Sequence, residues 1–376
     1  MSAPARRGCL AAHPRQVKHP IAAWIAARKA GQSARVFPLS DWKKARQPLI
    51  AIALVFSGCK ASPPPPAELQ LSTDLPEGTV DRLLANVAAQ GGPRGERVAG
   101  LGLGVTALDG GGGAANAGDL RWDLEPYGAI AAAARGELET MPVSGADVPE
   151  LWRDPGATWV AVGGRAEVLL VATGSIGEHP SPQKLLSLTE PWLKGRVALV
   201  QPAGGAALAH FAALYQAWGE ARMRGWLDGL HANDVQLFAT DAEVRAAVVE
   251  GRAWVGLLAS DEAAKAAASA ARVEVVYPNQ RSIGVFVWPT ALSRPKSSAH
   301  AGPAAQLAEK LADRSAEQLL VAREPGFLPL RPGIPTPPGV RSAANLVVIS
   351  VEPARIVAEI AGRREELNRW ISTARK

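Results

Sequence analysis

Short, continuous apolar segments alternate with helical patterns along most of this chain, and that alternation restricts the possible folds more than any other feature. Residues 166–172, 195–200 and 254–258 are apolar runs of this kind. A strand that reads as nearly unbroken apolar sequence is typical of a sheet covered on both faces. Between these runs, apolar residues recur every three to four positions, as in amphipathic helices. The pattern predicts an α/β fold of mostly parallel sheets flanked by helices.

Local signals predict where several of these elements begin and end. Asp241 stands before an apolar-periodic segment and is expected to cap a helix, with Gly251 in the left-handed position after its end. The spacing further predicts helices over 76–89 and 204–218, and strands over 68–74, 159–162, 166–172 and 283–288.

Charge is distributed unevenly along the 376 residues. The chain holds 41 Lys and Arg against 35 Asp and Glu, for a formal net charge of +6. Residues 1–58 account for ten of the basic residues and one of the acidic ones, so the remainder is slightly acidic. That remainder shows no basic stripe of the kind that follows a nucleic-acid backbone, so no nucleic acid is expected as a partner. The length suffices for two domains.

The N-terminal residues have the layout of a secretory signal. A basic run at 43–46 precedes an apolar run at 48–56, and Ser57, Gly58 and Cys59 follow. The apolar run is too short to span a bilayer, which takes about 20 residues, and the order of the segments is that of an exported chain. The alternative is a buried apolar strand that ends at an incidental cysteine. The first interpretation makes residues 1–58 a leader and signal peptide.

Small residues directly before a cysteine resemble the bacterial lipobox, in which the cysteine is acylated and becomes the mature N-terminus. Phe56 departs from the leucine usual at its position. Residues 59–67 include a run of prolines, which favours an extended, semi-rigid tether. Cleavage before Cys59 removes Cys9, which excludes a disulfide framework and a cysteine metal site. We therefore expect an exported lipoprotein, anchored through Cys59 at the periplasmic side of the bacterial cell envelope.

Several stretches of the body resemble one known family. Residues 122–126, with the sequence Trp-Asp-Leu-Glu-Pro, are similar to a Trp-Asn-x-Glu segment of the iron-binding type of periplasmic solute-binding protein. Residues 151–171 resemble the same family's Asp-Pro…Trp…Arg-x-x-Val run. The longest matching stretch runs from 188 to 280, and residues 328–330 also fit. The similarity covers most of residues 67–335.

This resemblance implies two α/β lobes joined by a hinge of crossing strands, which close over a ligand in the cleft. It implies a first lobe over 68–170, to which part of 275–376 returns, and a second lobe over 171–274. It also implies an ABC permease and ATPase as partners, a monomeric chain, and a small molecule or ion as ligand.

The chain departs from this family at the metal ligands. In iron-binding members, an adjacent tyrosine pair follows the strand that corresponds to residues 254–258, whereas residues 259–262 of this chain read Ala-Ser-Asp-Glu. The tyrosines of the chain are isolated from one another, at Tyr127, Tyr215 and Tyr277. Ferric iron also accepts carboxylate oxygens. A bound metal ion is therefore one alternative, with carboxylates as its ligands: Glu125, Asp261 and Glu262. No other cofactor is expected.

Two groups of candidate ligand-binding residues fall in the part matched to the first lobe. Glu125 and Asp123 belong to the loop that resembles the family's, and Thr73 and Asp74 end the first predicted strand. The alternative for each carboxylate is a solvated loop residue without a ligand.

Two further groups fall in the part matched to the second lobe. Ser260 and Asp261 follow a buried strand and precede a helix, the place where α/β sheets bind ligands. Gly204 and Gly205 open a helix, whose free amides favour an anion. The alternatives are a helix cap for Ser260 and ordinary turn chemistry for the glycines.

The sequence thus predicts the solute-binding lipoprotein of an ABC importer, with a metal ion, an oxyanion or a small organic anion as ligand. A degenerate, non-transporting sensory or structural lipoprotein of the same fold is the alternative. An enzyme on this scaffold is not expected, because the sequence lacks a nucleophile elbow, a phosphate-binding loop and a zinc-protease motif.

Overall fold

The computed structural model describes residues 68–99, 118–141, 147–269 and 272–374. The predicted leader, the lipidation site Cys59 and the proline-rich tether lie outside the described residues. All described residues belong to the compact unit Pro64–Lys376. The predicted lobe limits at 170 and 274 stay a prediction.

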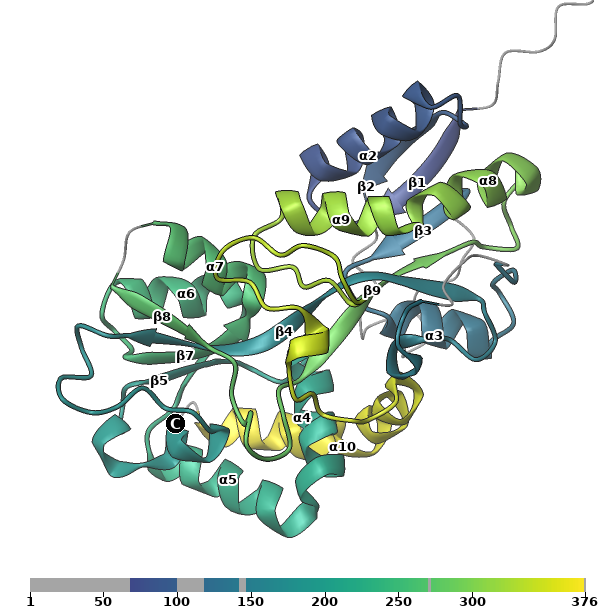
Figure 1. Ribbon diagram of the computed structural model, residues 1–376. Helices are drawn as coiled ribbons and strands as arrows, with labels where there is room; N and C mark the ends of the chain where they lie inside the picture. Colours follow the sequence, from purple (N-terminus) through teal and green to yellow (C-terminus); the bar gives the residue numbers. More distant parts are fainter. Residues whose placement is uncertain (1–67, 100–117, 142–146, 270–271, 375–376) are drawn as a thin grey trace, which may run out of the picture. The chain divides into compact units, whose positions relative to one another are not determined.

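Strands β1, β2 and β3 form a parallel group in the order β2-β1-β3. Helices α2, α8 and α9 lie beside this group (Figure 1) and share one apolar core with it. We refer to this assembly as the first lobe. Its elements are β1 (Leu69–Thr73), α2 (Glu77–Ala89), β2 (Gly95–Ala99), β3 (Leu120–Asp123), α8 (Ala301–Leu311) and α9 (Arg314–Arg323).

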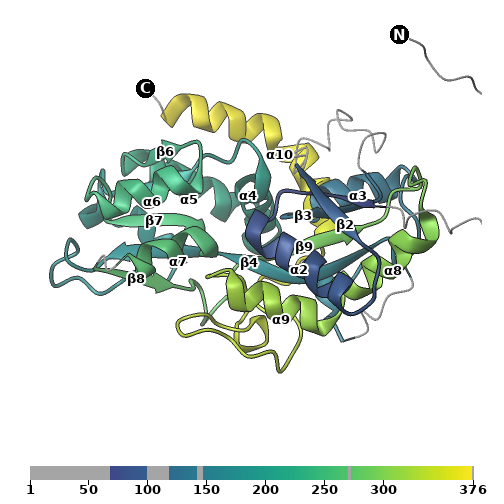
Figure 2. The same ribbon diagram turned by 90° about the horizontal axis from the view of Figure 1, so that it is seen from above.

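Strands β5, β6 and β7 form a second parallel group, in which β5 lies between the other two. Helices α4 to α7 gather around it (Figure 2), and α10 packs along α4. We refer to this assembly as the second lobe. Its elements are β5 (Val197–Val200), α4 (Gly205–Trp218), α5 (Glu220–Ala232), β6 (Gln236–Phe238), α6 (Asp241–Val249), β7 (Val255–Ala259), α7 (Ser260–Ala268), β8 (Val273–Val276) and α10 (Pro353–Ala374).

Two strands connect the lobes: β4 (Trp159–Ala172) and β9 (Val287–Ser293). The first half of β4 pairs with β9, which itself pairs with β3, and the second half of β4 pairs with β7 and β8. Among the described strands, every antiparallel pairing involves β4 or β9, while pairs within each lobe's parallel group are parallel. The predicted α/β fold with two lobes and crossing strands is confirmed.

The two strands predicted over 159–162 and 166–172 form one continuous strand, β4. A register shift between Ala161 and Gly164 interrupts its pairing with β9, and Gly163 has a φ of 70°. A Cβ on Gly164 would lie 2.8 Å from the Trp288 carbonyl oxygen, so the two backbones approach closely there. The sequence reads as two strands because this irregularity is built from the two glycines.

Burial of β4 alternates between two cores, as the period of two in a strand requires. Leu169 and Val171 pack in the core of α4, α5 and α10, whereas Val168 and Leu170 pack in that of α6 and α7. This explains the nearly continuous apolar sequence, because both faces of the strand are covered.

Two predicted boundaries shift in the structure. The cap of α6 is Thr240 and not Asp241: the Thr240 side chain accepts from Glu243 N, and Glu243 bonds back to the Thr240 amide, a reciprocal capping box. The predicted strand over 283–288 is replaced by β9, which starts at Val287. Gly251, with a φ of 77°, takes the predicted left-handed position after α6.

The remaining short elements link the lobes or cover their edges. Among the described helices, none combines the length and apolar character needed to cross a bilayer. The elements are α3 (Tyr127–Ala134), η4 (Glu150–Trp152), η5 (Leu185–Thr189), η6 (Pro191–Leu193) and η7 (Ala343–Asn345).

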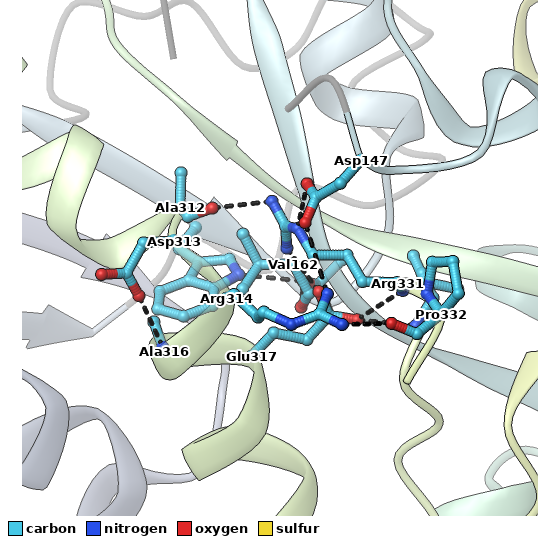
Figure 3. A network of polar contacts seen from close by, with 12 residues as sticks. Asp147, Val162, Ala312, Asp313, Arg314, Ala316, Glu317, Arg331 and Pro332 are labelled. Atoms are coloured by element: carbon cyan, nitrogen blue, oxygen red, sulfur yellow. Dashed lines mark hydrogen bonds and ion pairs between the residues drawn. The ribbon is translucent and has the colours of Figure 1, made fainter. Parts of the chain in front are cut away.

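A buried ion-pair network holds the segment after α9 against that helix (Figure 3). Arg331 is fully buried; its guanidinium pairs with Glu317, lies 2.7 Å from Asp147 Oδ1, and donates to the Ala312 carbonyl at 2.7 Å. The Glu317 carboxylate also accepts from the Leu330 amide at 2.6 Å. Both charges are therefore compensated by several hydrogen bonds, as a buried ion pair requires.

Candidate functional site

A pocket of about 310 Å³ lies where several strands end. Chain segments that follow β3, β5 and β6 line it, together with side chains of β4 and β9, which is the usual position of a ligand site in an α/β sheet. Its lining residues are Glu125, Arg165, Glu167, Val200, Gln201, Ala203, Gly204, Gly205, Ala206, Ala207, Ala239, Thr240, Asp241 and Trp288.

The Glu125 carboxylate meets the first turn of α4. Its Oε1 accepts a hydrogen bond from the Ala206 amide at 2.8 Å. Gly205 has a φ of 58°, and a Cβ there would lie 3.2 Å from the same oxygen. Free amides at a helix start favour an anion, so the chain's own carboxylate takes a position that an anionic ligand would otherwise fill.

Arg165 is the only basic side chain that lines the pocket among the described residues. It is 8% exposed, its Nη1 lies 3.4 Å from Asp261 Oδ1, and its guanidinium carbon lies 5.1 Å from the centre of the Trp288 ring. Arg165 and Trp288 are direct cross-strand partners on β4 and β9. Asp261 and the indole ring thus stabilise this buried cation.

Two more carboxylates face the same space. Glu167, two residues along β4 from Arg165, is 4% exposed, and the side chains of the two point to the same face of the strand. Asp241, at the start of α6, accepts from the Ala259 amide at 2.8 Å. With Glu125, the pocket therefore holds three carboxylates against one arginine.

Burial controls the protonation of these carboxylates. It raises the pKa of Glu125 from 4.5 to about 7, against the opposing field of Arg165. It likewise raises the pKa of Glu167 well above its ordinary value, and Asp241 adds to that shift. Burial is also the main cause of the raised pKa of Asp241. The carboxylates crowd one another, so a positive charge placed among them would favour their ionised forms.

Several buried polar atoms around the pocket have no hydrogen-bond partner in the described part of the chain. They are Glu125 Oε2, Arg165 Nε and Trp288 Nε1 from the lining, and Tyr127 Oη beside it. Buried polar atoms are nearly always paired in folded proteins. A concentration of unpaired ones around a single cavity is typical of a binding site whose ligand supplies the missing partners.

The structure brings three of the sequence-predicted residues together at this pocket: Glu125, Gly204 and Gly205. Asp261 lies next to it through its contact with Arg165. Ser260 is 2% exposed, and its hydroxyl donates to the Gly326 carbonyl at 2.6 Å while accepting from the Ala166 amide at 3.0 Å. Its hydroxyl thus joins β4, α7 and the segment after α9.

The other predicted residues contact the backbone or side chains of β1, β3 and the loop that follows β3. The Thr73 hydroxyl donates to the Trp122 carbonyl at 2.6 Å, and Asp74 accepts from the Leu124 amide at 2.7 Å. Asp123 is 5% exposed and lies 2.6 Å from Arg121 Nε, and burial raises its pKa to about 6. These three residues are not part of the pocket lining.

The carboxylates expected for a metal site do not converge on one point. Glu262 pairs with Arg245 and Lys265, and Asp261 with Arg165. Within the described ranges, no group of three or more His, Cys, Asp or Glu side chains is placed to hold a metal ion. His210 is not placed as a ligand either, because it is 1% exposed, stacks on Phe286 and does not line the pocket.

Sequence reasoning missed Arg165, Glu167, Trp288 and the pocket-facing role of Asp241. One signal was present: Arg165 and Glu167 are charged residues in the middle of β4, an apolar strand that is covered on both faces. A charge in such a strand requires a partner or a ligand. The roles of Trp288 and Asp241 carried no comparable signal.

Comparisons with proteins of known function give ferric iron-binding proteins as relatives. The major ferric iron-binding protein of Neisseria meningitidis serogroup B is 25% identical over 225 residues, which cover 57% of this chain. The match spans 64% of that relative's own length. The protein of the same name from Neisseria gonorrhoeae is 32% identical over 104 residues, which cover 26% of this chain and 31% of the relative.

Solved structures with similar folds include proteins with different ligands. Iron-bound HitA from Pseudomonas aeruginosa has a TM-score of 0.69 at 21% identity, over 80% of this chain and 99% of HitA. AfuA from Actinobacillus pleuropneumoniae, with fructose-6-phosphate bound, has a TM-score of 0.67 at 17% identity, over 82% and 98%. At these identities the likeness shows the fold, a two-lobed periplasmic binding protein.

A family model described as bacterial extracellular solute-binding protein matches residues 134–337, which is more than half of the chain. The match includes β4, β5, β7 and the helices α4 to α9, and hence most of the pocket lining. Proteins of this family bind solutes and are not enzymes, so the expectation of a binding protein is confirmed. The chain belongs to the bacterial extracellular solute-binding protein family.

Proposed function

We propose that this chain is the lipid-anchored solute-binding protein of an ABC importer, and that it captures a small solute in the pocket around Glu125, Arg165 and Glu167. A permease and an ATPase would be its partners. The observation that carries the proposal is the set of buried polar atoms without partners around one cavity, in the part of the chain that the structure describes. The family assignment and the likeness to iron-bound and sugar-phosphate-bound proteins support it.

The ligand classes expected from the sequence fit this pocket to different degrees. The carboxylates expected to bind ferric iron, Glu125, Asp261 and Glu262, do not converge, and the described residues hold no group of side chains placed to bind a metal ion. An oxyanion or organic anion would compete with Glu125 for the start of α4. The proposal therefore does not depend on the ligands of the relatives.

The binding function predicts a ligand-dependent melting temperature. A compound that binds only the folded chain at about 100 times its dissociation constant stabilises it by roughly 2.7 kcal/mol, which should raise the midpoint by several degrees. We would measure the purified chain against ferric iron with carbonate, other metal ions, oxyanions, phosphonates, organic acids and organic amines. Glu125→Ala should reduce the shift, because it removes a carboxylate from the pocket lining.

Glu309→Ala is the matched control, because Glu309 is an exposed residue of α8 outside the pocket. It should leave the ligand-induced shift unchanged. If no compound in the full panel changes the midpoint, the importer proposal fails. The alternative of a degenerate sensory or structural lipoprotein, which the missing tyrosine pair keeps open, would then be favoured.

The lipid anchor predicts that the chain leaves the membrane fraction when its cysteine is replaced. Cys59→Ala should move the protein from the membrane to the soluble fraction, because acylation at that sulfur would be its attachment. Cell fractionation with immunoblotting measures this, and Cys9→Ala is the matched control. Equal membrane association of the Cys59→Ala variant and the unaltered chain would contradict the anchor without affecting the binding proposal.

A further inference from the structure

The pocket holds more acidic side chains than its own basic residues can pair with. Glu125, Glu167 and Asp241 line it, and Arg165 is the one basic side chain among its described lining residues. Arg165 already lies 3.4 Å from Asp261, a carboxylate outside the lining. The lining carboxylates thus lack a cation of their own.

Glu167 gives an independent indication of a missing partner. The residue is 96% buried, and no hydrogen bond or ion pair reaches its carboxylate from the residues that the structure describes. Burying an acid without a partner is costly in a folded protein. Glu125 Oε2, also buried, is without a partner in the same described set. Two carboxylates, one on β4 and one after β3, therefore present oxygens without partners among the described residues to the same pocket.

The size of the pocket indicates a molecule and not a bare ion. The cavity of about 310 Å³ is many times the space that a single water molecule needs, so it has room for a small organic molecule. The metal-type cluster that a bare cation needs is missing from the described residues. Two donors without partners there, Arg165 Nε and Trp288 Nε1, can serve one hydrogen-bond acceptor on such a molecule.

The start of α4 argues against an anion. Besides Arg165, the starts of α4 and α6 are the features of the described lining that favour negative charge, and at α6 the Thr240 side chain already accepts from the Glu243 amide. At α4, Glu125 Oε1 already accepts the Ala206 hydrogen bond at 2.8 Å. An anionic ligand would have to displace this carboxylate and would then face Glu167 and Asp241.

We propose that the solute is a small organic cation, whose ammonium or guanidinium group pairs with Glu167 and Asp241 and whose acceptor group meets Trp288. This inference rests on the proposed binding function and specifies its ligand class. It uses the carboxylates of β4 and α6, which lie beside the start of α7: Glu167 is the cross-strand partner of Ala259, and Asp241 accepts from the Ala259 amide at 2.8 Å.

Protonation provides a signature of such a ligand. Burial raises the pKa of Glu125 to about 7 and that of Glu167 well above its ordinary value, and the charged groups facing them are Arg165, Asp74, Asp241 and Asp261. A bound cation would favour ionisation of both acids, so binding should release protons and weaken as the pH falls below 7. An anionic ligand would take up protons and bind more tightly at low pH.

Isothermal titration calorimetry on the purified full-length chain tests the inference. The probes are 1,4-diaminobutane, agmatine and choline, with succinate, phosphate and ferric iron with carbonate as the opposing class. We expect at least one of the cations to bind, with proton release at pH 7, and about tenfold more weakly at pH 6 than at pH 8. Glu167→Gln should weaken it by at least about tenfold.

The variants separate the failure of this inference from that of the proposed function. Glu309→Gln, an exposed carboxylate of α8, should bind the cation as the unaltered chain does. Asp241→Asn supplies a second pocket variant if Glu167→Gln does not fold. Binding of an anion or of ferric iron, unaffected by Glu167→Gln, would overturn the cation assignment and leave the binding protein intact. Failure of every cation to bind would also overturn the cation assignment. The melting-temperature measurements test the binding function separately.

Discussion

Replacing Arg331 with methionine should lower the free energy of unfolding by about 3–5 kcal/mol, the range measured when one partner of a buried ion pair is removed. Arg331 and Glu317 are both 0% exposed (Figure 3), so Arg331→Met leaves the Glu317 carboxylate buried without its cation. The Ala312 carbonyl also loses its donor. Urea denaturation followed by circular dichroism measures the loss.

Arg314→Met is the matched control for this change. Arg314 pairs with the same aspartate, Asp147, at 3.4 Å, but its side chain is 47% exposed. Exposed ion pairs contribute about 0–1 kcal/mol, so this variant should lose less than about 1 kcal/mol. The double variant Arg331→Met/Glu317→Gln should recover part of the loss, since no unpaired charge remains buried. A loss below about 1 kcal/mol for Arg331→Met would contradict the stabilising role of the network.

The ligand-free chain should be more stable at pH 6.5 than at pH 8. The folded-state pKa of Glu125 is raised from 4.5 to about 7, so the folded chain binds more protons than the unfolded chain above pH 4.5. Stability then falls as the pH rises through that window. The expected difference from Glu125 is about 1 kcal/mol, and Glu167, whose pKa burial also raises, contributes in the same direction. Urea denaturation at the two pH values measures it.

Neither pH value is below 6.5, because the contribution of His210 to stability changes with pH in the opposite direction. Burial lowers the pKa of His210 to about 3, so its contribution to stability is lost as the pH falls below 6.5. Glu125→Gln should remove the part of the difference that comes from Glu125 and stabilise the ligand-free chain at pH 8. Glu309→Gln should leave the difference unchanged. If stability is flat or increases from pH 6.5 to pH 8, the pocket carboxylates are not held protonated.

The Arg331–Glu317 network and the pocket lie in different parts of the chain, and burial affects their carboxylates differently. In the network, the Glu317 carboxylate is matched by Arg331, a cation of the same chain. In the pocket, the carboxylates lack such a match, so the folded chain meets their cost by protonation or by binding a cation. Glu167→Gln should therefore increase stability while weakening cation binding, a trade-off typical of functional sites.

The sequence predicted the order of strands and helices because buried side chains recur every two residues in a strand and every three to four in a helix. β1, α2 and α4 lie where alternating or three-to-four-residue spacing predicted them, and Gly251 ends α6 as a left-handed residue should. The errors have local causes. The register shift at Gly163 and Gly164 joins two predicted strands into β4, and a capping box at Thr240 moves the start of α6 by one residue.

By itself the sequence determined the α/β class and the family likeness, and it predicted that Glu125 and the Gly204–Gly205 turn belong to a ligand site. These features depend on periodicity, turn chemistry or a short matched segment, all of which act over a few residues. Only the tertiary structure decided that Glu125, Glu167, Asp241 and Trp288 share one pocket. They come from segments far apart in the chain, and the electrostatic interactions between them exist only after β3, β4, β9 and α6 have packed. The ligand class inferred here is a consequence of that packing.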